Sequence, residues 1–491
     1  MSATTIDIPA QSGRPRPERV VGRALAVFRH SLGDPALRRA QLAFGLLWSS
    51  EWALTVALTV IAFRAGGAAA VAALAAVRML PAAVMAPLTT VLADRLPRAR
   101  ILLGAALARA TVLAIAARCA GAHDGMAWLY LLTAVAAVAF VTVRPAHSAL
   151  LPALCQTPDQ LSAATAVRGL MDSVGTLVGP LVATSLLVVA SPAAVIAVVA
   201  VSTGLAGLLI WGIDGAGPPV RPTAAAPRLR ARSAIRDARR YARDSAAGIA
   251  GLARHRDAGV VLCVALTQTF TRGCLGVLTV VMAAGMLHSG PAGVGALSTA
   301  IGAGAVAGSL GAVTLASSGA LARWEGVGAA LWGLPLVLAA AVPHETVVLG
   351  CLAAVGAGNA LIDVGLFSLP AWIVPDELLG RVFGTFESLI SLTVALGSLV
   401  ASVLVAWLGI RGALVAVGAV APAFTALSWP RLARIDRRVN RDRRARGERR
   451  KADVGRAERD RRIGADRRVG GDRRAGTAID EVGVSVVAVS R

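Results

Sequence analysis

Long apolar stretches of about twenty residues alternate with short polar segments over most of the chain between Leu42 and Trp429. A stretch of this length with few charges crosses a bilayer as a helix, because only a helix satisfies its own backbone hydrogen bonds within hydrocarbon. The pattern therefore predicts an all-α polytopic membrane protein. We expect spanning helices over residues 42–63, 67–93, 101–118, 126–143, 165–190, 192–213, 259–287, 291–317, 326–342, 346–373, 379–407 and 409–429.

The connections between the predicted spans alternate in charge. One set is rich in arginine, and the other set is short and nearly neutral. Because arginine and lysine accumulate in cytoplasmic loops, we expect both termini and the central loop in the cytoplasm. The chain then divides into a cytoplasmic N-terminal segment (1–41), a six-helix bundle (42–213), a basic cytoplasmic loop (214–257), a second six-helix bundle (258–429) and an arginine-rich tail (430–491).

Composition agrees with a membrane protein and bears on its partners. Hydrophobic residues make up 56% of the 491 residues, and charged residues make up only 16%. The net charge of +22 lies mainly in the two terminal segments and the central loop, not on a folded domain, so we expect no nucleic-acid partner. Five single cysteines indicate neither a disulfide framework nor a metal site.

Both terminal segments have patterns of their own. No signal peptide is expected, and residues 20–29 alternate apolar and arginine positions at helical spacing, which predicts an amphipathic helix on the inner membrane surface; a disordered segment is the alternative. In the tail, an acidic residue followed by Arg-Arg recurs at six-residue spacing, which fits neither a helix nor a strand. We expect a disordered tail, and attraction to anionic lipid is the alternative. The acids stand at Asp436, Asp442, Glu448, Asp460, Asp466 and Asp472.

The segment after the second span contains Asp94, Arg95 and Arg98 and resembles the cytoplasmic loop motif of the major facilitator superfamily. Two glycines and one basic position of that motif are replaced here. In such a motif an acidic side chain can face the positive N-terminal end of another helix and hold the inward gate closed. The expected partner is the start of the eleventh span, around Arg381, and residues 319–323 form a weaker copy in the second half. A simple basic loop is the alternative.

The fifth span contains Gly175, Gly179 and Pro180, which resemble the G-x-x-x-G-P motif of exporters in the same superfamily. Glycines four residues apart let another helix approach closely, and proline bends a helix. Ordinary small-residue packing is the alternative, because the trailing glycines of the motif are absent.

Three further segments narrow the resemblance to the branch that contains enterobactin-type exporters. They are residues 78–81, 144–152 and 380–388. The resemblance covers about residues 35–430 and implies two six-helix bundles in the major facilitator fold.

Ionisable residues within predicted spans are functional candidates, because a charge in hydrocarbon is costly unless it faces a cavity or a partner. Glu51 and Asp363 are the main candidates for carrying protons, since a partly desolvated carboxylate can take up and release a proton near neutral pH. A structural ion pair is the alternative for each charged residue. Further proton-carrier candidates are Asp172 and Glu387, and candidates for lining a cavity or forming ion pairs are Arg78, Arg109, Gln268, Arg272 and Asn359.

Other chemistries lack support. The glycines at 302, 304 and 308 lie in an apolar span with no preceding strand, so helix packing explains them better than a dinucleotide loop. The sequence has no zinc-like histidine pair, no Walker loop and no nucleophile elbow, so we expect no enzyme, cofactor or metal.

The hypothesis is a monomeric secondary transporter in a bacterial cytoplasmic membrane that exports a small amphipathic molecule, drug-like or siderophore-like, by proton antiport. Its expected partners are membrane lipids, the substrate and protons. An importer or uniporter of the same fold is one alternative, and a membrane scaffold or sensor acting through its basic tail is another.

Overall fold

A computed structural model of the protein describes residues 33–95, 97–122, 126–155, 158–213, 256–315, 320–369 and 376–479. The predicted amphipathic segment at 20–29 and nearly all of the central loop lie outside these ranges. The chain forms two units, Met1–Ala433 and Arg434–Arg491. The first unit contains the apolar helices that concern function.

Ten described helices are long and apolar enough to cross a membrane. The helices of the structure are α2 (Pro35–Arg95), α3 (Arg98–Ala122), α4 (Met126–Val141), α5 (Val143–Leu154), α6 (Pro158–Val189), α7 (Pro192–Ile210), α9 (Arg256–Gly285), α10 (Gly290–Leu315), α11 (Leu321–Ala341), α12 (Glu345–Ser368) and α14 (Asp376–Ile479). The predicted all-helical membrane fold is confirmed.

Two of these helices each carry two predicted spans. Helix α2 is interrupted at Gly66 and Gly67, and Gly67 has φ 63° and ψ −152°. Helix α14 is interrupted at Gly409, with φ 68° and ψ −179°. Only glycine adopts such a conformation without steric cost, so these residues reverse the chain between apolar runs. All twelve predicted runs therefore lie wholly or largely on described helices.

The second unit differs from the disordered tail that the six-residue repeat suggested. Helix α14 continues to Ile479, beyond the last apolar run. The tail has no proline after Pro430 and is rich in arginine and alanine, which favour a helix even without an apolar face. The repeat therefore does not exclude helical backbone.

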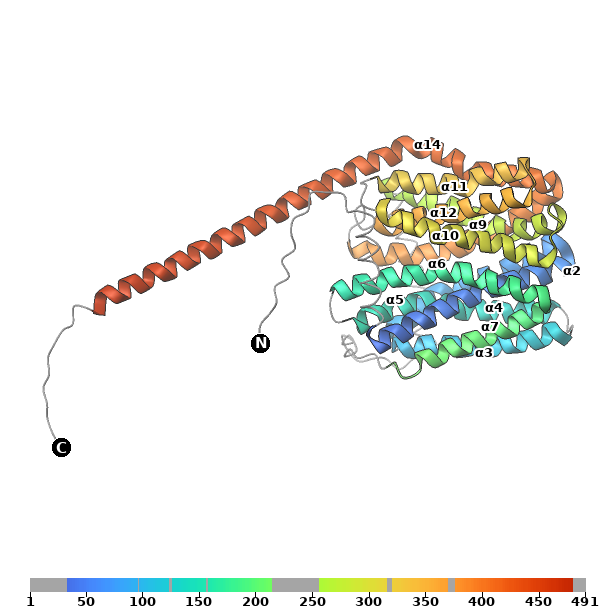
Figure 1. Ribbon diagram of the computed structural model, residues 1–491, viewed down its shortest axis with the longest axis horizontal. Coiled ribbons are helices and arrows are strands. Elements are labelled where there is room, and N and C mark those ends of the chain that lie inside the picture. The colour runs from blue at the N-terminus through green and yellow to red at the C-terminus, as the bar shows by residue number, and fades with distance from the viewer. Residues whose placement is uncertain are drawn as a thin grey trace, which may run out of the picture. The chain divides into compact units, whose positions relative to one another are not determined.

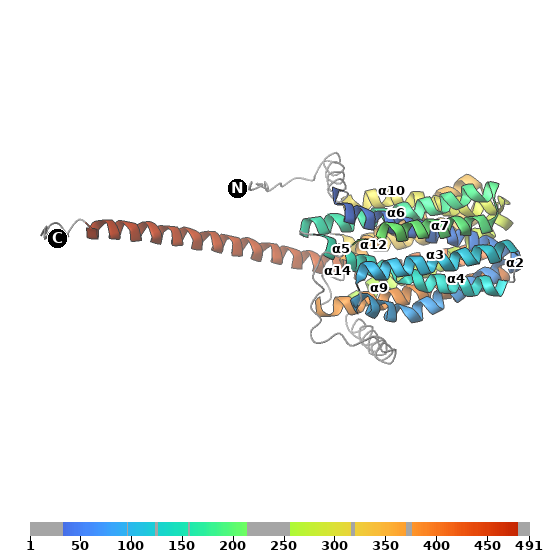
Figure 2. The same ribbon diagram turned by 90° about the horizontal axis from the view of Figure 1, so that it is seen from below.

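The helices of the first unit pack side by side in two groups (Figures 1 and 2). Helices α2 to α7 contact one another, and α9 to α12 form a second set of contacts. The groups meet where α6 packs along α10 and where α2 packs on α9. Gly302 of α10 lies directly against the backbone of Thr176 and Leu177. The meeting surface between the groups is therefore closely packed along α6 and α10.

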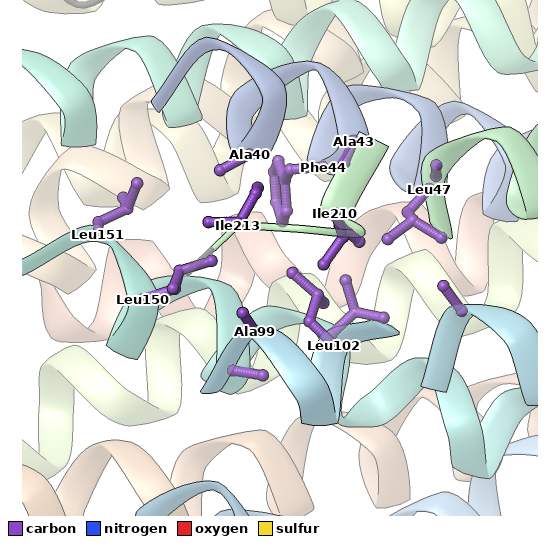
Figure 3. Close-up of a cluster of buried hydrophobic side chains, with 14 of the residues drawn as sticks. Ala40, Ala43, Phe44, Leu47, Ala99, Leu102, Leu150, Leu151, Ile210 and Ile213 are labelled. Carbon is purple, nitrogen blue, oxygen red and sulfur yellow. The ribbon is translucent and has the colours of Figure 1, made fainter. Parts of the chain in front are cut away.

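A buried apolar cluster fixes the first group near the beginning of α2 (Figure 3). Phe44 and Leu47 of α2 are fully buried against Leu102 of α3 and Leu150 of α5, with Ile210 of α7 closing the cluster. Burying a side chain of this size contributes about 1.5–3 kcal/mol. This cluster holds α2, α3, α5 and α7 in place, and α2 supplies side chains to the site described next.

Candidate functional site

A cavity of about 280 Å³ lies between the two helix groups. Helices α2, α4 and α5 line it from the first group, and α9, α10, α11 and α14 line it from the second. Most of its wall is apolar, and the charged residues that line it are Glu51, Arg78, Arg144 and Arg272. A cavity with apolar walls and few charged groups is typical of a small-molecule site.

Glu51 is held by two arginines from different helix segments. Its Oε1 accepts a hydrogen bond at 2.7 Å from Arg78, which lies in the part of α2 after the interruption at Gly67. Its Oε2 accepts one at 2.6 Å from Arg109 of α3. The side chain of Arg109 is 1% exposed and that of Arg78 is 5% exposed. The Arg109 guanidinium also lies 4.3 Å from the ring centre of Phe140. We call Glu51, Arg78 and Arg109 the arginine triad.

A smaller, more polar chamber of about 70 Å³ adjoins the cavity. We call it the carboxylate chamber because Asp172 and Asp363 line it. Residues in the last turns of α12 line the chamber, whereas the lining of the larger cavity extends further along α2, to Thr59. The two spaces share a wall formed by Trp48, Trp52, Arg144, Arg272, Ile301, Trp332 and Ile390.

A chain of amide hydrogen bonds orients Asp363 within this chamber. Gln268 of α9 donates to Asn359 of α12 at 3.0 Å, and Asn359 donates to Asp363 Oδ2 at 2.9 Å. Asn359 and Asp363 stand four residues apart, so one helix face carries both. The chain joins α9 to α12 and places a carboxylate beside the cavity.

Two arginines of the shared wall lie over tryptophan rings. The Arg144 guanidinium is 4.8 Å from the ring centre of Trp48, and Arg272 is 5.2 Å from that of Trp52. Arg144 also forms an ion pair with Asp172 at 3.1 Å. Arginine over an aromatic face is attracted by the ring quadrupole, so these contacts hold the wall between cavity and chamber.

The structure brings most of the predicted site residues together. The candidates Glu51, Arg78 and Arg109 meet in the triad, and the candidates Asp172, Gln268, Arg272, Asn359 and Asp363 line the carboxylate chamber. The side chains of Asp94, Arg95, Arg381 and Glu387 lie outside the described part of the chain, as does any contact of the predicted latch, and Arg98 opens α3.

Gly175 and Gly179 lie where a close helix approach requires them. A methyl group on Gly175 would lie 2.9 Å from the Trp48 side chain, and one on Gly179 would lie 2.7 Å from Trp52 Cβ. Pro180, which follows them, is inside α6. These glycines therefore set the distance between α6 and the part of α2 that lines the cavity.

The aromatic residues of the site were missed by sequence reasoning. Trp48, Trp52 and Phe140 line the cavity, but none of them was among the site candidates. Their spacing offers one signal: Trp48 and Trp52 stand one helical turn apart on the same span as Glu51. A tryptophan in an apolar span is otherwise indistinguishable from a lipid-facing residue.

Comparisons with known proteins agree with this architecture. The family model of the Major Facilitator Superfamily matches residues 41–326. A search of curated proteins found no significant match. Among solved structures, the chain is similar to a POT family transporter in complex with 5-aminolevulinic acid, at 14% identity and a TM-score of 0.64, covering 81% of this chain and 96% of that one.

Two other solved structures show the same fold. The human organic anion transporter MFSD10 (TETRAN) has 19% identity and a TM-score of 0.60 over 81% of this chain and 100% of that one. The nucleoside transporter NupG has 13% identity and a TM-score of 0.61 over 82% of this chain and 100% of that one. The family match covers more than half of the chain, and it fits a cavity between two helix groups. This chain belongs to the major facilitator superfamily and is a secondary transporter, not an enzyme.

Proposed function

We propose that the protein exports a small amphipathic molecule and uses inward proton flow as the driving force. The observation that carries the proposal is a pair of adjoining spaces between the two helix groups, one with mostly apolar walls and one with two carboxylates. The larger space has room for the apolar body of a substrate. The smaller space offers groups that can carry a proton. The resemblance of residues 78–81, 144–152 and 380–388 to enterobactin-type exporters supports the outward direction.

The proposed orientation follows from loop charge. With both termini and the central loop in the cytoplasm, the end of α12 and the beginning of α2 face inward. The carboxylate chamber then lies on the cytoplasmic side of the larger cavity. We place the protein in the bacterial cytoplasmic membrane, where a proton entering from outside reaches Asp363 by way of the substrate cavity. The predicted latch of Asp94 with the region of Arg381 would close the cytoplasmic side.

Asp363 is the proton carrier we propose, in preference to Glu51. Both carboxylate oxygens of Glu51 are paired with arginine, so taking up a proton there would leave two buried guanidiniums without a counter-ion. Asp363 accepts a hydrogen bond from the neutral amide of Asn359 and lines a polar chamber. Asp172 and Glu387 remain further candidates.

Metabolite profiling of a deletion strain tests the function first. We expect one amphipathic compound to accumulate inside the cells, or sensitivity to such a compound to increase. Everted vesicles that contain the protein should then take up this compound when their interior is acidic. Uptake by right-side-out vesicles alone would indicate an importer, and transport that ignores the pH gradient would indicate a uniporter.

Alternating access is tested by crosslinking the two helix groups. The Oγ atoms of Ser173 on α6 and Ser309 on α10 lie 2.9 Å apart across the group boundary. Replacing both by cysteine and oxidising the pair should stop transport, and reduction should restore it. The matched control is Ser50 with Ser202, whose Oγ atoms are also 2.9 Å apart but lie within the first group. Equal inhibition of both pairs would contradict movement at the boundary.

Deleting residues 436–491 separates transport from a function of the tail. A transporter keeps its transport activity without these residues. Complete loss of activity in a folded, membrane-inserted deletion variant would favour the scaffold or sensor alternative.

A further inference from the structure

We propose that the larger cavity binds an amphipathic organic anion, with the acidic group of the substrate at Arg78 and its apolar body against the cavity wall. This inference rests on the proposed use of the cavity as the transport site, and it adds the chemical class of the substrate. The observation behind it is the arginine triad, which joins two guanidiniums to one carboxylate and therefore has a net positive charge.

The donors of Arg78 are not all used by the protein. The side chain of Arg78 is 5% exposed and lines the cavity, and one of its Nη atoms donates to Glu51. Its Nε atom is buried without a hydrogen-bond partner among the described residues. The protein therefore compensates the guanidinium charge only in part, and an acidic group against the part of Arg78 that lines the cavity gains a charge-assisted interaction.

Among the residues that the structure describes, the other charges that line the cavity and the chamber do not cancel this surplus. Arg144 is paired with Asp172 at 3.1 Å, and the carboxylate of Asp363 lies in the same chamber as Arg272. Those two arginines and two acids balance formally. The positive charge of the triad is therefore what a substrate meets, and it favours a negative group.

The aromatic residues around the site argue against a cationic substrate. Tryptophan and phenylalanine faces attract organic cations, but three of these rings already have a guanidinium above them. Arg109 covers Phe140 at 4.3 Å, and Trp48 and Trp52 are covered by Arg144 and Arg272. An organic cation would have to compete with these fixed charges, whereas an anion would not.

The walls provide for the apolar part of the ligand. Val56, Val71, Leu74, Leu275 and Val294 contribute apolar side chains to the cavity wall. At about 280 Å³ the cavity is near the lower end of the usual range for ligand sites, about 300–1,000 Å³. A compact aryl or alkyl group with one acidic end matches this size and charge.

Proton entry and anion exit have the same electrical sense. An anion that leaves the cytoplasm and a proton that enters both move positive charge inward. A membrane potential that is negative inside therefore drives both movements.

Binding of three matched probes tests the substrate class without depending on transport. The probes are 4-phenylbutyrate, its neutral amide, and 4-phenylbutylamine, and the readout is thermal stabilisation of the purified full chain as each probe is titrated. We expect the acid to bind about tenfold or more tightly than the amide, and the amine to bind most weakly. Equal or tighter binding of the amine would overturn the proposal, as would the absence of stabilisation by all three at millimolar concentration.

Substitution of Arg78 links the preference to the triad. Arg78→Gln should lower the affinity for the acid to that for the amide and leave the affinity for the amide unchanged. The substitution keeps the Glu51–Arg109 ion pair. Arg78→Lys retains the charge and should keep part of the preference, which guards against a folding defect in the first variant. Arg118→Gln, at an exposed arginine away from the cavity, should behave as the natural protein. An acid preference that survives Arg78→Gln contradicts the proposal.

The two failures are distinguishable. If the preference for the acid depends on Arg78 but vesicles show no transport, the proposed anion site is supported and the proposed export function is contradicted. If vesicles export a compound that is cationic, transport stands and the anion site fails.

Discussion

Replacing Glu51 by glutamine removes the carboxylate of the arginine triad. The substitution keeps the size of the side chain and one acceptor oxygen, but it leaves two guanidiniums without their counter-ion. Arg109 is fully buried, and its Nε and Nη1 atoms already have no hydrogen-bond partner in the described chain. The perturbation therefore isolates the charge from the packing.

The structure sets the expected magnitude. Breaking a buried ion pair by removing one partner costs about 3–5 kcal/mol, because a buried charge is left uncompensated. Glu51 is 15% exposed and its partners are 5% and 1% exposed, so solvent screens the triad little. We expect Glu51→Gln to lower the free energy of unfolding by about 3–5 kcal/mol. Asp172→Asn is the matched comparison. Both side chains of that ion pair are 25% exposed, so its loss should cost less than the loss of Glu51.

The assay is equilibrium unfolding of the purified protein in mixed micelles titrated with dodecyl sulfate. A second variant separates charge from a folding defect: Glu51→Gln combined with Arg109→Met removes a buried charge together with its partner. Replacing a buried ion pair by apolar groups is often close to neutral, so the double variant should recover at least half of the loss. The reasoning would be refuted if Glu51→Gln cost no more than Asp172→Asn, or if the double variant were less stable than the single one.

Two further predictions concern glycines. Gly179→Ala should cost about 1–3 kcal/mol, because its methyl group would collide with the backbone of Ser49 and lie 2.7 Å from Trp52 Cβ; Gly169→Ala on the same helix, with nothing within 4 Å, should be neutral or stabilising in the same titration. Equal losses would show that α2 and α6 are not in close contact. Gly276 lines the cavity, and a Cβ at this position would have nothing within 4 Å. Gly276→Val should therefore fill part of the cavity and abolish probe binding without changing the stability of the protein. Unchanged binding would place the ligand elsewhere.

The sequence predicted the membrane helices well because the signal is local. Twenty apolar residues in a row identify a span without knowledge of its neighbours. The chain reversals at Gly67 and Gly409 coincide with the first residues of the predicted runs 67–93 and 409–429, and their positive φ selects glycine. The four-residue spacing of Asn359 and Asp363 is likewise a local signal, because it puts them on one helix face, where they form a hydrogen bond.

Contacts between helices were not predictable from the same signal. Glu51, Arg78 and Arg109 were each recognised as costly charges, but their spacing along the chain gives no information about which of them meet. Glu51 was therefore proposed as a proton carrier, although the structure shows both of its oxygens paired with arginine. Gln268 and Asn359 lie on different helices, so their hydrogen bond depends on how α9 packs against α12.

The most direct test of proton-coupled export through the carboxylate chamber is to measure gradient-driven transport by the Asp363→Asn variant. In proteoliposomes, the compound identified by metabolite profiling is supplied with and without a pH gradient, and exchange of labelled for unlabelled compound is measured alongside. The account predicts that the variant still exchanges the compound but no longer accumulates it in response to the gradient. Accumulation at the natural level in Asp363→Asn would contradict the account.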